Sequence, residues 1–355
     1  MNNELTSKLD KYIEDCVKLF DLAGLIVGVG NVKTGYTYEG AAGVRNIETK
    51  ELMKTNHVFH MASVSKLLTS MAIFMLIDEG KLNLEQKVLD FLTDSSIADR
   101  RCIPLSCEID IEKIKNQVRN TGEVAKNPYE EEMSKAYIDD KRYKEVTIRH
   151  LLTHTSGLFE GKFVHNPDDK YFNYADTEYD LLGVVVEVAS GIPYDKFINE
   201  RILLPLGMSD SEMSITLREN LVTGHSKDSE NRIITSEYFE YGLGRAPSSC
   251  LTSTVADMKK WSEEVLINKT LLSPESYEFA LKEYVKTQDG RVMCMSWFKR
   301  TQNGYELYGH LGSDEGYKIG FWVCPELGVH LTVMSNITKT PINRICEEIF
   351  DMISQ

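Results

Sequence analysis

The chain has 355 residues, of which 42% are hydrophobic and 26% are charged, which is ordinary for a globular protein. Its formal net charge of −14 argues against a protein that binds nucleic acid through a basic surface. The seven cysteines are scattered and form no Cys-x-x-Cys pair, so we expect neither a disulfide framework nor a zinc ribbon.

The beginning of the chain carries no export signal that we recognise. Its first ten residues lack a basic segment followed by an apolar one, and no run approaches the ~18 apolar residues of a membrane span. We therefore expect a cytoplasmic protein without a membrane span, although a leader removed ahead of residue 1 would leave the same sequence.

The N-terminal part predicts a helix, a hairpin and a second helix. Apolar residues recur at helical spacing over 4–22, which indicates an amphipathic helix. The segments 25–31 and 36–39 are separated by a glycine turn and predict two paired strands. The next helix begins at Ser63 and should end near Gly80, a residue type typical of helix ends.

Residues 95–145 differ from the rest, because they are rich in charge and poor in apolar side chains. We interpret this segment as an insertion on the surface with one short helix. The alternative is a lid or wall of a substrate cleft.

The remaining pattern predicts helices first and strands afterwards. Helices are expected at 147–154 and 178–189, and another starts at Ser253–Thr254. The last third predicts strands and a final helix, at 292–297, 305–310, 317–324, 329–334 and 342–352.

Strands at both chain ends with helices between them predict an α+β protein whose antiparallel sheet is formed by both termini. We expect a sheet region made of residues 1–60 and 240–355. The mainly helical region should comprise residues 61–239 and contain the charged insertion.

The turn Ser63-Val-Ser-Lys66 is the first candidate for chemistry. Residues three apart share a helix face, so a hydroxyl and an amine lie side by side among apolar residues. A serine hydroxyl becomes a nucleophile when a neighbouring base takes its proton, and an amine in apolar surroundings is able to serve. Ser-x-x-Lys alone also occurs by chance in many helices.

Three further stretches stand out. Tyr174 precedes the helix at 178–189, where a nearby cation would let it act as general acid or base. The glycines of 308–313 let a strand approach another chain or a ligand closely. The turn 154–158 follows a short helix. Each stretch alone has an ordinary structural explanation.

Together these motifs resemble the serine β-lactamase and penicillin-binding-protein superfamily, in the branch of class C β-lactamases, DD-peptidases, D-aminopeptidases and β-lactamase-fold esterases. The resemblance extends from about residue 20 to 350. It implies the β-lactamase/DD-peptidase fold and an acyl-enzyme mechanism without a cofactor. It is carried, in chain order, by Ser63-Val-Ser-Lys66, Leu151-Leu-Thr-His-Thr-Ser-Gly-Leu158, Tyr174-Ala-Asp176 and His310-Leu-Gly312.

The resemblance also implies roles for individual residues. Ser63 would be the nucleophile, and Lys66 would ease its deprotonation. Tyr174 would relay the proton, and His310 would complete the cleft opposite it, where some relatives have a lysine. The backbone N–H groups of Ser63 and Ser313 would form the oxyanion hole.

The chain departs from the family pattern at two motif positions. Asp176 stands where Asn is usual, so its charge would keep Lys66 protonated, shift the base role toward Tyr174 and favour a substrate amine over a carbonyl. Leu311 replaces a small hydroxylated residue and would make the cleft edge apolar. We assign Asp176, Leu311 and Gly312 to substrate binding and expect that efficient β-lactam hydrolysis is not the main activity.

We therefore predict a cofactor-free serine hydrolase acting on an ester, amide or lactam bond of a small molecule or short peptide. A non-catalytic penicillin-binding-like sensor and an efficient class C-type β-lactamase are the alternatives. His150 and His154 have metal-ligand spacing, but they lack an obvious third ligand, so we expect no metal. The sequence makes no prediction of oligomeric state.

Overall fold

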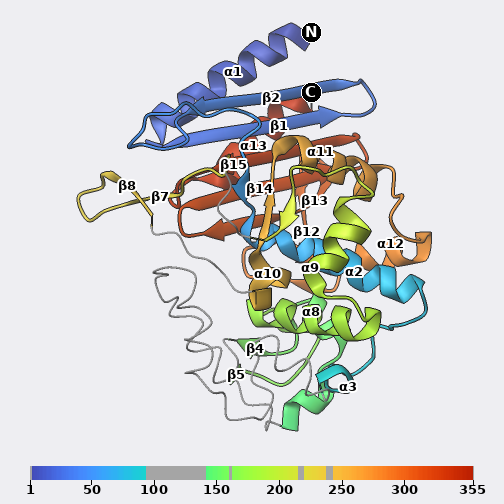
Figure 1. Ribbon diagram of the computed structural model, residues 1–355. Coiled ribbons are helices and arrows are strands. Elements are labelled where there is room, and N and C mark those ends of the chain that lie inside the picture. Colours follow the sequence, from blue (N-terminus) through green and yellow to red (C-terminus); the bar gives the residue numbers. More distant parts are fainter. Residues whose placement is uncertain (1, 93–140, 160–161, 215–219, 237–242, 355) are drawn as a thin grey trace.

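An antiparallel sheet crosses the molecule, and its strands come from the two ends of the chain (Figure 1). Among the described residues it has eight strands in the order β10-β11-β12-β13-β14-β15-β1-β2. The N-terminal hairpin adds to the C-terminal strands through β1 and β15, with Val27 opposite Val333. The strands are Gly24–Asn31 (β1), Tyr36–Gly43 (β2), Val285–Lys286 (β10), Val292–Met293 (β11), Phe298–Gln302 (β12), Tyr305–Asp314 (β13), Tyr317–Cys324 (β14) and Val329–Ser335 (β15).

The computed structural model describes residues 2–92, 141–159, 162–214, 220–236 and 243–354. Nearly all of the predicted charged insertion at 95–145, including its short helix, lies outside these residues. Its role as decoration, lid or wall therefore stays a prediction.

Two helices cover one face of the sheet. They are α1, Asn2–Leu19, and α13, Ile342–Ile353, and they contact each other as well as the strands beneath them. Leu9, Ile13 and Ile345 belong to the apolar cluster between these helices and the sheet. The amphipathic helix predicted at the start of the chain thus packs its apolar side on one face of the sheet.

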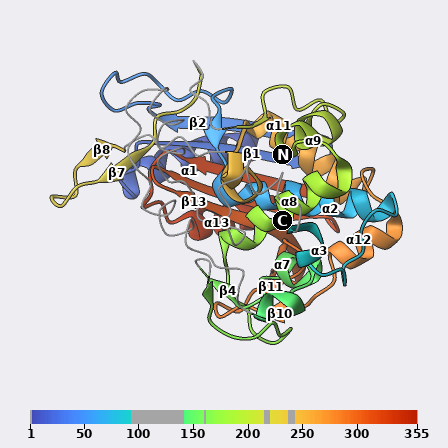
Figure 2. The same ribbon diagram turned by 60° about the horizontal axis from the view of Figure 1, so that its bottom comes forward.

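The other face carries the helices that lie between the two strand groups in sequence. They include α2, Ser65–Asp78, and α8, Asp176–Ser190, which pack side by side (Figure 2). Every residue of α2 except Met75, Ile77 and Asp78 is buried, as expected for a helix that is apolar on all sides. Because both faces are covered, β15 is buried throughout, which explains its nearly continuous apolar sequence.

The remaining elements connect these layers. The strands are Phe59–His60 (β3), Leu158–Phe159 (β4), Lys162–Phe163 (β5), Glu212–Met213 (β6), His225–Lys227 (β7), Ile233–Thr235 (β8) and Leu251–Ser253 (β9). The helices are Leu89–Leu92 (α3), Ile148–Leu152 (α7), Tyr194–Ile198 (α9), Ala246–Ser249 (α10), Val255–Ser262 (α11) and Pro274–Ala280 (α12). Short helical turns are Ala62–Val64 (η1), Lys141–Glu145 (η3), Asn199–Leu203 (η4), Leu243–Arg245 (η5) and Glu263–Ile267 (η6).

The predicted α+β architecture is confirmed, with an antiparallel sheet built from both chain ends and helices inserted between them. The bounds of the sheet and helical regions, 1–60 with 240–355 and 61–239, stay a prediction.

The prediction of one strand over 292–297 is wrong. β11 ends at Met293, and a separate strand, β12, begins at Phe298. The break is at Ser296, which has a φ of +77° and is buried. Its backbone N–H donates to Leu152 and its hydroxyl to the carbonyl of Lys66, so the turn is fixed by contacts that the local sequence does not reveal.

The strand predicted at 305–310 continues to Asp314 as β13. Its neighbour β14 pairs with it up to Asp314, which lies opposite Tyr317. The glycine-rich stretch that we interpreted as a strand end therefore lies within a strand.

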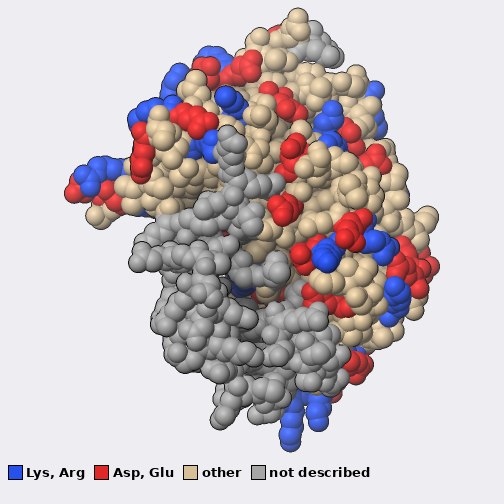
Figure 3. All heavy atoms as spheres, viewed as in Figure 1, with Lys and Arg blue, Asp and Glu red and all other residues tan. Residues whose placement is uncertain are grey.

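No helix in the described part of the chain is long and apolar enough to cross a membrane. On the face shown in Figure 3, acidic and basic side chains are interspersed and form no single basic surface. This agrees with the acidic composition.

Candidate active site

Ser63 lies in the turn η1, between β3 and the buried helix α2. The preceding residue, Ala62, has a φ of +47°, a strained conformation for a residue with a side chain. The hydroxyl of Ser65 donates to the carbonyl of Ala62 at 2.6 Å and accepts from the backbone N–H of Leu251 at 2.9 Å. Strand β9 therefore holds the turn in place, and Ser63 itself stays only half-buried.

Lys66 places its amine next to the Ser63 hydroxyl. Its side chain is fully buried, and Nζ lies 3.0 Å from Ser63 Oγ, 2.7 Å from Asp176 Oδ1 and 2.9 Å from the carbonyl of Ser248. Three acceptors match the three protons of an ammonium group. Burial alone would lower the pKa of Lys66, but the charge of Asp176 and the contact with Tyr174 outweigh it and raise the pKa. Lys66 is therefore a cation.

Tyr174 reaches the same two groups from the segment before α8. Nζ of Lys66 lies 5.0 Å from the centre of the Tyr174 ring. Burial raises the pKa of Tyr174, whereas the charge of Lys66 and hydrogen bonding with Lys66 and Ser63 oppose that rise. Tyrosine and lysine are therefore coupled, and the lysine cation favours loss of the phenol proton.

His310 on β13 closes this group of side chains. Its ring centre lies 6.1 Å from that of Tyr174 and 4.9 Å from that of Phe298. Burial, helped by the charge of Lys66, lowers the pKa of His310 to about 3, so the ring is neutral. Nδ1 donates to the carbonyl of Leu311 at 2.6 Å, which leaves Nε2 as an acceptor without a partner among the described residues. A lysine at this position would be a cation with donors at its end, whereas His310 is neutral and its Nε2 is an acceptor.

Strand β13 passes close to the Ser63 turn. A Cβ added to Gly312 would lie 2.3 Å from the carbonyl oxygen of Met61, two residues before Ser63. Strand β12 pairs with β13 only as far as Gly309, so the segment that approaches the turn lies beyond that pairing. The side chain of Ser313 is exposed and accepts a hydrogen bond from Lys318. Leu311 is half-buried and packs against the cluster beneath α1 and α13.

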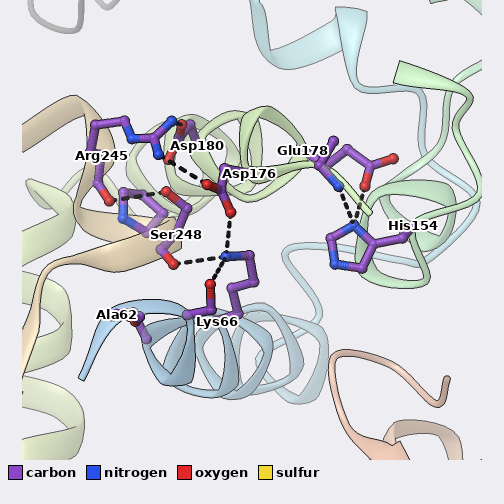
Figure 4. Close-up of polar contacts among 12 residues, drawn as sticks. Ala62, Lys66, His154, Asp176, Glu178, Asp180, Arg245 and Ser248 are labelled. Carbon is purple, nitrogen blue, oxygen red and sulfur yellow. Dashed lines mark hydrogen bonds and ion pairs between the residues drawn. The ribbon is translucent and has the colours of Figure 1, made fainter. Parts of the chain in front are cut away.

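The carboxylate of Asp176 joins Lys66 to a second cation, Arg245, in η5. Nη2 of Arg245 donates to Asp176 Oδ2 at 3.0 Å (Figure 4). Burial opposes ionisation of Asp176, but Lys66 and Arg245 hold its pKa at about 2. Nη1 of Arg245 lies 3.6 Å from Oδ2 of Asp180, a fully buried residue one helical turn further along α8. Burial raises the pKa of Asp180 to about 6, and the Arg245 charge limits that rise.

A second pair of buried polar groups, His154 and Glu178, lies on the other side of Lys66 (Figure 4). Nδ1 of His154 contacts a Glu178 oxygen and accepts from the backbone N–H of Ala175. The rings of His154 and Tyr174 are 4.4 Å apart between centres. Burial lowers the pKa of His154 and raises the pKa of Glu178, so burial favours the uncharged form of each group.

Across the described ranges there is no group of three or more His, Cys, Asp and Glu residues that is able to hold a metal ion. His150 instead pairs with Thr147 to cap the start of α7, and His154 contacts Glu178. Both histidines thus have structural partners.

The structure brings together Ser63, Lys66, Tyr174, Asp176 and His310, all of which the sequence singled out. It also adds Arg245 and Asp180, which sequence reasoning missed. The sequence did contain one signal. Asp176 and Asp180 are four residues apart and therefore share one face of α8. Because this helix is apolar and buried, two carboxylates on one of its faces require a cation nearby. The sequence did not indicate which cation, because Arg245 is about seventy positions away.

Known proteins are similar to this chain over most of its length. The chain is 26% identical to penicillin-binding protein 4* of Bacillus subtilis over 322 residues, which cover 79% of this chain and 61% of that protein. It spans 61–66% of the length of the first curated relatives that it matches.

Solved structures share the fold. The octameric penicillin-binding protein homologue from Pyrococcus abyssi has a TM-score of 0.77 at 22% identity, covering 98% of this chain and 77% of that one. The D-amino acid amidase from Ochrobactrum anthropi SV3, complexed with D-phenylalanine, has a TM-score of 0.75 at 17% identity, covering 99% of both chains.

The sequence profile of the family Beta-lactamase matches residues 9–347, and the chain belongs to that family.

Proposed function

We propose that this protein is a serine hydrolase in which Ser63 attacks the carbonyl carbon of a small ester or amide and forms an acyl-enzyme. One observation carries the proposal: the half-buried Ser63 hydroxyl lies 3.0 Å from the fully buried amine of Lys66, next to Tyr174. A serine that binds only ligand has no need of a buried cation and a phenol beside it.

The charge states suggest how the proton moves. Because Lys66 is held as an ammonium ion, it does not serve as the base. The reactive form is the one in which Tyr174 has lost its proton, and Lys66 stabilises that phenolate against the effect of burial. Ser63 transfers its proton to the Tyr174 phenolate as the bond between Oγ and the carbonyl carbon forms. The phenol then protonates the leaving group, whose bond to the carbonyl carbon breaks. Water then attacks the carbonyl carbon of the acyl-enzyme while Tyr174 takes its proton. Tyr174 returns that proton to Ser63 Oγ as the bond between Oγ and the carbonyl carbon breaks, which frees Ser63.

The backbone N–H groups of Ser63 and Ser313 are the proposed donors to the oxyanion. The support is the close approach of β13 to the turn at Gly312. Removing one such donor commonly costs on the order of a hundredfold in rate.

For the substrate we propose an amide or ester of a small amino-acid-like molecule, by analogy with the D-amino acid amidase that shares this fold. The neutral His310 and the ion-paired Asp176 distinguish the site from the pattern of relatives with Lys and Asn, so we expect poor β-lactam turnover. Rapid nitrocefin hydrolysis by the wild type that Asp176→Asn leaves unchanged would refute this expectation.

Covalent labelling tests the proposed function. The folded wild type should react with a fluorophosphonate probe, and peptide mapping should place the adduct on Ser63. Ser63→Ala should lose the label and at least about a thousandfold of its activity on D-amino-acid amides and p-nitrophenyl esters. Ser313→Ala is a matched control, because it keeps the backbone N–H and should keep the label. Folded wild type that takes neither this probe nor a fluorescent penicillin would favour a ligand-binding module.

A further inference from the structure

A row of alternating charges extends from the Ser63 hydroxyl into the helical layer. It runs from Lys66 to Asp176, then to Arg245 and finally to Asp180, with closest contacts of 2.7, 3.0 and 3.6 Å (Figure 4). None of the sequence motifs contains Arg245 or Asp180. We propose that Arg245 is a positioning residue of the Ser63 site, which holds Asp176 against Lys66 and makes the charge facing Ser63 and Tyr174 net positive. This inference rests on the proposed function.

The geometry leaves Asp176 little freedom. One carboxylate oxygen faces the Lys66 amine and the other faces the guanidinium of Arg245. The planar guanidinium spans two carboxylates four residues apart on α8, which would otherwise repel each other. Asp176 is thereby fixed at the end of the lysine side chain, where it is also the first residue of α8 and is favoured by the helix dipole.

The charge balance gives Arg245 a chemical consequence. A Lys66–Asp176 pair alone has no net charge. The Asp176 anion would therefore cancel most of the electrostatic stabilisation that the Lys66 cation gives to the Tyr174 phenolate. Asp176 indeed raises the pKa of Tyr174, whereas Lys66 lowers it. Arg245 compensates Asp176 and leaves one positive charge in the group of three. Asp180 lies beyond Arg245 in the row. Its carboxylate is coupled to Arg245 first and then to Asp176 and Lys66, so it offsets part of that positive charge.

Other groups facing these side chains do not replace that charge. His154 and His310 face Lys66 and Tyr174, and burial keeps both rings neutral. Ser248 contacts Lys66 through its carbonyl and is uncharged. Within the described part of the chain, the charges that act on Asp176 are Lys66 and Arg245, together with Asp180 on the next turn of α8. Glu178 also faces Lys66, and burial raises its pKa, which favours its uncharged form.

The inference predicts that two substitutions move the same pH profile in opposite directions. The observable is the rate of fluorophosphonate labelling of Ser63 between about pH 7 and pH 11, which rises as Tyr174 loses its proton. Burial raises the pKa of Tyr174 and places this limb toward the alkaline end of the range. Arg245→Gln removes a cation, disfavours the phenolate and should shift the rising limb up by about one pH unit, a tenfold loss of rate below the limb. Asp176→Asn removes an anion and should shift the limb down by a similar amount.

Two controls separate this role from general damage. Arg245→Lys keeps the positive charge and should return the limb to within about 0.3 units of the wild type. Arg201→Gln breaks a different arginine–carboxylate pair, with Glu79, at a partly exposed position and should leave the profile unchanged. If Arg245→Gln does not fold, Asp180→Asn with Arg245→Gln removes the stranded carboxylate, and the same upward shift is expected.

A limb that stays in place in the folded Arg245 variants, or moves in the same direction in Arg245→Gln and Asp176→Asn, overturns the inference. These results would leave the proposed function intact as long as Ser63 is labelled. Wild type that is unlabelled at every pH would instead overturn the proposed function.

Discussion

In the proposed mechanism, the charge of Lys66 decides how Ser63 is activated. A buried lysine loses its proton easily unless an anion compensates the loss of hydration. In this chain the anion is Asp176, at a position where the family pattern usually has Asn. Asp176 raises the pKa of Lys66 and so favours its cationic form. In the proposed mechanism this leaves proton transfer to Tyr174.

His310 gives a prediction about stability and pH. Its native pKa is about 3, whereas a histidine in the unfolded chain titrates near 6.5. Between these values the unfolded chain binds a proton that the native state excludes, so stability falls as the pH drops from about 6.5 toward 3. In His310→Gln the loss of unfolding free energy between about pH 7.5 and 4.5 should be smaller by roughly 2 kcal/mol. Urea unfolding at several pH values measures it, and an unchanged slope would contradict the assignment.

The position of β13 against the turn η1 is the main relation between elements at the site. Because Gly312 faces the carbonyl of Met61, the strand lies against the backbone just before Ser63. A side chain at this position would push the two elements apart. Glycine, which weakens most strands, is here the residue that permits the close approach.

Gly312→Ala should therefore damage chemistry more than folding. The added methyl group would contact the carbonyl oxygen of Met61. A backbone oxygen cannot move away by a change of rotamer, so the strand itself must shift, and the proposed oxyanion site widens. We expect labelling of Ser63 to slow by about a hundredfold in the folded variant. Gly28→Ala on β1 is the control, because its Cβ would also crowd a neighbour, lying 2.8 Å from Cβ of Val255, but on a strand that is not paired with β13. Its labelling rate should remain near that of the wild type. A wild-type rate in Gly312→Ala would count against this role for β13.

The elements that the sequence predicted well are those with a strong local pattern. The apolar helix around Lys66, the helix after Tyr174 and the buried strands predicted at 317–324 and 329–334 all follow from periodicity or continuous apolar runs. The break at Ser296 was missed because contacts with residues far away in the sequence impose it.

The residues of the candidate site likewise divide into those that a short motif reveals and those that only the fold reveals. Ser63, Lys66, Tyr174 and His310 were found because each belongs to a short motif whose order resembles a known family. Arg245 and Asp180 belong to no motif, and their role depends on distances that only the fold sets. The neutral state of His310 was likewise hidden, because it follows from burial and from the bond that Nδ1 makes with Leu311.

At the scale of the whole molecule, the sheet ties the two ends of the chain together. The hairpin of residues 24–43 is hydrogen-bonded to β15, about three hundred positions later. In the sequence, the helices that carry Lys66 and Asp176 lie between this hairpin and β15. The nucleophile and lysine come from the start of this enclosed segment, while His310 comes from the sheet. The candidate site is therefore complete only when both layers have assembled.

The central claim is that substrate turnover passes through an acyl group on Ser63. The most direct measurement is to mix the protein with a p-nitrophenyl ester, quench it in acid during turnover and map the modified peptide by mass spectrometry, in parallel with hydrolysis by Ser63→Ala. The account predicts one acyl group, located on Ser63, and no hydrolysis above background by the folded variant. Hydrolysis that persists in Ser63→Ala, or an acyl group on another residue, would contradict it.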